Sequence, residues 1–199
     1  MTNKVPCKEC GVQILPETAG KTGGICMACK NGIRANLEQA KAYYQREREL
    51  ENSCPFRSYW RDLVSRVFDS QGGFESLNDN EKLYYSVNCL NSEIHNGGFA
   101  QYFDNSAGEH AAYAEIGLAT LGANDALRLF REARYIAFGD AEVPVDRLVR
   151  MKAVEREGVF TALDKLDDEY YKDLDNLGNK LEQFALDKGL VCNANIRLK

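Results

Sequence analysis

The sequence predicts an all-α protein: a compact bundle of six to eight helices, preceded by a small zinc-ribbon module and a linker helix. Three observations support this fold class. Residues 55–191 show almost no alternation with a period of two, and their apolar residues recur three and four positions apart. Glycine pairs and capping patterns divide that stretch into helix-sized pieces. Two Cys-x-x-Cys pairs precede it.

The cysteine pairs predict a metal site. Cys7 is paired with Cys10 and Cys26 with Cys29, and 15 residues separate the pairs. A Cys-x-x-Cys turn lets two thiolates face one ion, and two such turns complete a tetrahedral shell. We therefore expect one structural Zn²⁺ on these four cysteines in a module of residues 1–32. Because so short a module has little apolar area, metal binding would largely fold it.

Residues 33–54 are expected to form the linker helix. Ile33, Leu37, Ala40 and Tyr44 share one helix face, and Cys54-Pro55 ends the segment. The apolar stripe must cover either the main domain or a partner chain. Residues 55–199 are expected to form the helical domain.

The first helices of that domain have clear boundaries. One is predicted from Phe56 to Ser70, and the next begins at Asn78, where Glu81 completes a capping box. Residues 106–122 are apolar almost all round, so we expect them to form the central buried helix, with Ser106 as its N-cap. Asn124 is predicted to cap the following helix and Pro144 to open the one after it.

Residues 92–110 contain both histidines, His95 and His110, and predict a corner between helices. Asn96-Gly97-Gly98 is a helix stop followed by a sharp turn. We expect Glu93 to accept hydrogen bonds from backbone N–H groups that the glycine pair leaves free. The alternative is a hydrolase-like enzyme with Glu93 as general base and both histidines nearby. Residues two apart on a helix point about 200° apart, so we favour the corner and a protein without enzymatic activity.

The same stretch resembles a known family. Its residues follow the pattern E-x-x-N-G-G-F-x-Q-Y-F-x-N-x-x-G, which is similar to the C-terminal domain of the DNA-mimic protein family over roughly residues 57–188. The resemblance implies an all-α fold, a homodimer as one arrangement, and an acidic surface that imitates duplex DNA and occupies DNA-binding proteins. The matching residues are Glu93, Asn96, Gly97, Gly98, Phe99, Gln101, Tyr102, Phe103, Asn105 and Gly108.

A mimic must present carboxylates to a partner whose lysines and arginines normally meet phosphates. Residues 164–187 hold eight acids against three lysines, and Asp164, Asp168 and Asp175 share one face if the helix continues. The body's arginines must then lie elsewhere or pair internally. The predicted partner-binding residues are Asp164, Asp167, Asp168, Glu169, Asp173 and Asp175.

Charge and composition narrow the function further. Residues 1–54 carry a net charge of +2 and residues 55–199 a net charge of −7, so the helical domain is a poor candidate for binding duplex DNA directly. Nucleic-acid binding through the ribbon is an alternative, although no aromatic residue precedes Tyr43. Neither a membrane-spanning run nor a signal-peptide core is found. We therefore expect a cytoplasmic protein-interaction module. An acidic DNA mimic that inhibits a DNA-binding protein or nuclease is one form of this prediction, and binding to another kind of protein partner is the other.

Overall fold

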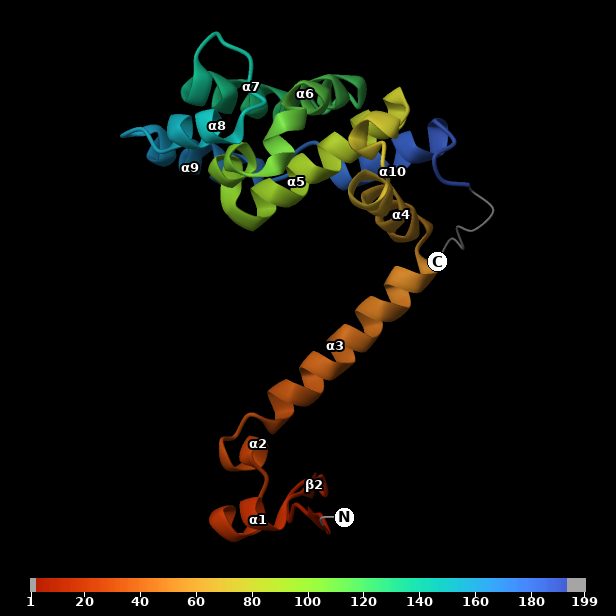
Figure 1. Cartoon of the computed structure of the whole chain (residues 1–199), viewed down its shortest axis with the longest axis vertical. Coiled ribbons are helices and arrows are strands. Elements are labelled where there is room, and N and C mark those ends of the chain that lie inside the picture. Colours follow the sequence, from red (N-terminus) through yellow and green to blue (C-terminus); the bar gives the residue numbers. More distant parts are fainter. Residues whose placement is uncertain (1–2, 193–199) are drawn as a thin grey trace. The chain divides into compact units, whose positions relative to one another are not determined.

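Helices dominate the structure, which confirms the predicted fold class. A computed structural model of the chain describes residues 3–192, and these form two units that divide between Ser53 and Cys54 (Figure 1). Within the described residues, the single sheet is a two-stranded antiparallel hairpin in the first unit.

The first unit combines this hairpin with two short helices and one long one. In the hairpin, Val5 pairs with Ile14, and Gly11 adopts a left-handed φ of +72° in the turn between the strands. The long helix α3 occupies the range predicted for the linker, and its apolar residues Leu37 and Tyr44 are exposed. The elements are β1 (Val5–Pro6), β2 (Gln13–Ile14), α1 (Pro16–Thr22), α2 (Met27–Lys30) and α3 (Arg34–Ser53).

The second unit contains seven α-helices and two 3₁₀ turns within its described residues. The elements are α4 (Pro55–Asp69), η1 (Gly73–Ser76), α5 (Asp79–Asp104), η2 (Ser106–His110), α6 (Ala111–Thr120), α7 (Asn124–Phe138), α8 (Arg147–Val154), α9 (Val159–Tyr170) and α10 (Leu177–Asp187).

Helix α5 is the central element of this unit, where the sequence predicted residues 106–122. It begins with the predicted capping box, because Asn78 accepts from the Glu81 N–H while Glu81 accepts from the Asn78 N–H. Helices α4, α6, α8, α9 and α10 all contact it (Figure 1). Residues 106–110 instead form η2, Ser106 makes no cap, and Ile116 of α6 is 54% exposed.

Two predicted helix starts differ in the structure. Asn124 does not cap α7; the Asp175 carboxylate accepts a 2.8 Å hydrogen bond from the Ala126 N–H there. Helix α8 begins at Arg147 with Asp146 as its N-cap, so Pro144 lies upstream of the first turn. At both helix starts a carboxylate accepts a hydrogen bond from a free backbone N–H group. The positive end of the helix dipole stabilises the negative charge there.

The predicted glycine corner is present inside α5. Gly97 and Gly98 break the helical conformation, and helical geometry resumes at Phe99. Gly98 has φ +78° and ψ −178°, a conformation that is accessible almost only to glycine. A Cβ atom at Gly98 would lie 2.0 Å from Oδ2 of Asp167 on α9. The corner therefore needs glycine for its backbone conformation and for the close approach of α9.

Gly98→Ala is expected to destabilise the protein more than a matched control does. Gly158 has a similar φ of +80°, but a Cβ atom there would meet nothing within 4 Å. Gly158→Ala should cost about 1 kcal/mol of backbone strain. Gly98→Ala should cost at least about 1 kcal/mol more, because its ψ of −178° is less accessible to a side chain than the ψ of −19° at Gly158 and because the methyl group displaces Asp167. Denaturant melts of the two variants measure the difference, and equal losses would contradict the packing role of Gly98.

Candidate functional site

The four paired cysteines converge in the first unit. Cys7 and Cys10 lie in the turn of the hairpin, Cys26 is the N-cap of α2, and Cys29 lies within α2. Their Sγ atoms are all within 4.8 Å of one another. A tetrahedral ion with metal–sulfur bonds of about 2.3 Å places its sulfurs about 3.8 Å apart. The Sγ atoms of Cys10 and Cys26 are 3.7 Å apart, so this group could hold a metal ion.

The surroundings of two of these sulfurs, those of Cys7 and Cys26, favour the thiolate, whereas burial and the neighbouring sulfurs raise the pKa of Cys29 to about 12. The Cys26 N–H donates to Sγ of Cys7 over 3.1 Å, and the Cys29 N–H donates to Sγ of Cys26 over 3.4 Å. The bond from Cys29, assisted by the Arg34 guanidinium at 2.9 Å, lowers the pKa of Cys26 to about 6. Because thiolates are the metal-binding form of cysteine, the site is prepared for a cation.

The polar residues of the glycine corner bond to one another rather than to the freed backbone. Oε2 of Glu93 accepts from the side-chain amides of Gln101, at 2.7 Å, and Asn105, at 2.8 Å. The Phe99 N–H instead donates to Oδ1 of Asp167, 68 residues away, over 2.8 Å. Glu93 was expected to accept such N–H groups, but α9 brings the Asp167 carboxylate closer to the new helix start.

The aromatic residues of the motif point inward. Phe99, Tyr102 and Phe103 are fully buried in the core, and Gly108 lets the Arg150 side chain pass, since a Cβ there would lie 2.8 Å from its Nε. Asn96 is exposed at the start of the corner. The motif thus shapes the core of the second unit.

The residues of the hydrolase-like alternative are only partly assembled. Glu93 and His110 line one cavity of about 350 Å³ together with residues of α4. His95 lies outside that cavity, where its ring contacts those of Tyr170 and Tyr171 and its Nδ1 bonds to the Asn91 carbonyl. Burial lowers the pKa of His110, whose ring stacks on Phe74 with centroids 3.7 Å apart.

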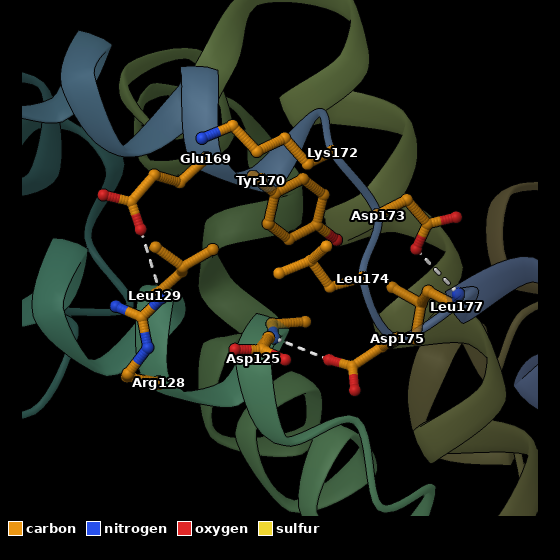
Figure 2. Close-up of a pocket in the computed structure, with 11 residues that line it drawn as sticks. Asp125, Arg128, Leu129, Glu169, Tyr170, Lys172, Asp173, Leu174, Asp175 and Leu177 are labelled. Atoms are coloured by element: carbon orange, nitrogen blue, oxygen red, sulfur yellow. Dashed lines mark hydrogen bonds and ion pairs between the residues drawn. The ribbon is translucent and has the colours of Figure 1, made fainter.

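Several acids of the predicted partner surface are used in contacts within the protein, as helix caps or in an ion pair (Figure 2). Asp173 accepts from the Leu177 N–H at the start of α10, Asp175 from Ala126 at the start of α7, and Glu169 pairs with Arg128 at 3.1 Å. Helix α9 ends at Tyr170, so Asp175 does not share a helix face with Asp164 and Asp168. The small cavity between these segments measures about 70 Å³.

Asp164 and Asp168 differ from these acids. Both are exposed, and in the described part of the chain neither has a hydrogen bond or ion pair. The arginines do pair internally: Arg131 and Arg134 reach Glu115, Arg147 reaches Asp104, and Arg156 donates to carbonyls at the end of α7.

A family model described as DMP19-like protein matches residues 75–188. The chain belongs to the DMP19-like protein family. No curated protein and no solved structure matches it. The DMP19-like segment contains the corner, both histidines and α9, and it begins after α4 and the cysteine cluster. Among the described residues, no helix is long and apolar enough to span a bilayer.

Two features of this DMP19-like protein were not predicted from its sequence. Arg150 is 1% exposed and donates to four backbone carbonyls, among them those of Phe103 and Asn105. In the sequence, Arg150 lies in the helical run LVRMKAV, and nothing in that run distinguishes it from an ordinary solvated arginine. Trp60 and Phe68 form a wall of the Glu93 cavity. Trp60 and Phe68 are eight positions apart, and this spacing in the sequence indicates that they lie on similar sides of α4.

Proposed function

We propose that the protein is a protein-interaction module in which one face of α9 binds a basic, nucleic-acid-binding partner in the manner of a DNA mimic. The observation that carries the proposal is the pair Asp164 and Asp168. The two carboxylates lie one turn apart, about 6 Å along the helix, are exposed, and have no internal partner in the described residues.

Two aromatic residues extend the same surface. With 3.6 residues per turn, Phe160, Asp164, Asp168 and Tyr171 fall within an arc of about 80°, and we call these four residues the α9 face. Tyr171 is the C-cap residue of α9 and keeps helical backbone angles, and its hydroxyl donates to the Ile94 carbonyl. Phe160 is 63% exposed and Tyr171 46% exposed. Aromatic rings beside carboxylates suit arginine and lysine side chains, because the rings add cation–π contacts to the ion pairs. Lys165 lies off this arc.

Membership of the DMP19-like family supports an interaction role of this kind. Four of the six predicted partner-binding acids make hydrogen bonds or an ion pair within the protein: Asp167, Glu169, Asp173 and Asp175. The proposed surface therefore carries fewer free carboxylates than the sequence predicted. The two exposed aspartates therefore have to carry the specificity. The N-terminal module is proposed to hold one structural Zn²⁺ and the protein to act in the cytoplasm, with a homodimer as one arrangement.

The α9 face is tested by displacement. Basic DNA-binding proteins of the source organism, each bound to a fluorescent DNA duplex, are titrated with the protein, and release of the duplex is followed by anisotropy. At least one should release its DNA, with an apparent affinity that falls steeply as salt rises. Asp164→Asn with Asp168→Asn should weaken this release about tenfold or more.

The matched control neutralises two other exposed acids, Asp140→Asn with Glu182→Gln. It removes the same charge from the domain and should leave the release nearly unchanged. Mimicry by the α9 face is refuted if no duplex is released, or if both double variants lose the same affinity.

The metal proposal has its own test. The purified protein should contain about one zinc per chain by elemental analysis, and Cys26→Ser should lose it, because three thiolates no longer close the tetrahedron. Cys54→Ser, outside the cluster, should keep the metal. A strong chelator should unfold residues 3–32, since binding energy of about 10 kcal/mol or more folds such modules. A metal-free protein with dispersed amide signals from these residues would contradict the proposal.

A further inference from the structure

The cavity beside Glu93 lies within the second unit, between α4, α5 and η2. Its volume is about 350 Å³, which is within the range of small-molecule sites. Helix α4 contributes Trp60 and Phe68, α5 contributes Tyr85 and Glu93, and η2 contributes Glu109 and His110. The wall from α4 is held firmly, because Leu63 is fully buried and the rings of Trp60 and Tyr85 stack with centroids 5.5 Å apart.

The charge of this cavity is negative. Glu93 and Glu109 line it, and no lysine or arginine is among its lining residues, all of which are described. The nearby Lys82 is paired with Glu75 at 2.6 Å, and Arg66 is paired with Glu81 at 2.6 Å. Both cations are therefore already paired with other carboxylates. The buried Arg150 acts on Glu109 and His110 through its charge, but it donates to backbone carbonyls and does not line the cavity.

Glu93 is oriented within the cavity wall. Its Oε2 accepts both amide hydrogen bonds, from Gln101 and Asn105, and these hold the half-buried carboxylate in place. Within residues 3–192, its Oε1 accepts no hydrogen bond. One oxygen of a fixed carboxylate is thus left for a donor that the chain itself does not supply.

His110 does not provide that donor. Its ring is stacked on Phe74, its Nε2 lies 3.4 Å from Oε1 of Glu109, and burial lowers the pKa of the imidazole. The other lining residues are mostly apolar, and three of them, Trp60, Tyr85 and Phe68, carry aromatic rings that suit an apolar or cationic group.

From this arrangement we propose that the cavity binds a small organic cation, an amine with an apolar body. The ammonium group bonds to Oε1 of Glu93, and the body packs against Trp60 and Phe68. A neutral ligand would leave the carboxylate without a counter-charge, and an anion would be repelled by both glutamates. This site is separate from the α9 face and does not depend on the proposed mimicry.

The chain contains a single tryptophan, Trp60, and that residue lines the cavity. Its indole N–H therefore gives one NMR resonance that reports directly on occupancy. The probes are 2-phenylethylamine, which is protonated at neutral pH, its neutral counterpart 2-phenylethanol, and the anion phenylacetate. The amine should shift the indole resonance saturably, with a Kd of about 1 mM or tighter, and the other two at least about tenfold more weakly.

Two variants in the cavity and one control variant outside it locate the site. Glu93→Gln should remove the preference for the amine over the alcohol, whereas Glu182→Gln, an exposed acid outside the cavity, should retain it. Ser92→Phe fills the cavity and leaves both carboxylates, so it should abolish the response to all three probes. Ser92→Phe therefore tests whether the probes bind in this cavity even if the Glu93→Gln protein does not fold.

The proposal is overturned by any of three results. The amine gives no saturable shift, the three probes shift the resonance equally, or the response persists unchanged in folded Ser92→Phe protein.

Discussion

The second unit depends on a short helix that is capped at both ends by buried charged side chains. This helix is the part of α5 after the glycine corner, from Phe99 to Asp104. Asp167 accepts from the N–H of Phe99 at its start, and Arg150 donates to the carbonyls of Phe103 and Asn105 at its end, over 2.8 and 2.9 Å. Each charge complements the helix dipole at its own end, and each such cap contributes about 0.5–2 kcal/mol.

Burial acts against both charges, since it raises the pKa of Asp167 and lowers the pKa of Arg150. Hydrogen bonds to otherwise unsatisfied backbone groups offset that cost. The caps also fix neighbouring elements, because Asp167 belongs to α9 and Arg150 to α8. With Asp167 turned inward, Asp164 and Asp168 of the same helix face solvent. The acidic run is thus divided between side chains that assemble the fold and side chains that are free to meet a partner.

The sequence predicted those features that depend on local chemistry. The cysteine pairs, the capping box at Asn78 and the break at Gly97-Gly98 each specify their structure within a few residues, and the helical period specified the fold class. Features that depend on distant contacts were not predicted. Asp167 reaches Phe99 across 68 residues and Asp175 reaches Ala126 across 49, so no local pattern distinguishes these acids from solvated ones. The Glu93 cavity likewise arises only when α4 packs against α5.

Hydrogen exchange at the Phe99 amide tests the capped helix most directly. If Asp167 holds this N–H in the core, the Phe99 amide should exchange only when the domain opens. Its free energy of opening should then lie within about 1 kcal/mol of that of a buried α5 amide such as the amide of Leu90. In Asp167→Ala it should exchange at least about tenfold faster relative to Leu90, whereas Asp167→Asn, which still offers an acceptor, should retain most of the protection. A Phe99 amide that exchanges as fast as exposed loop amides in the unaltered protein would contradict this account.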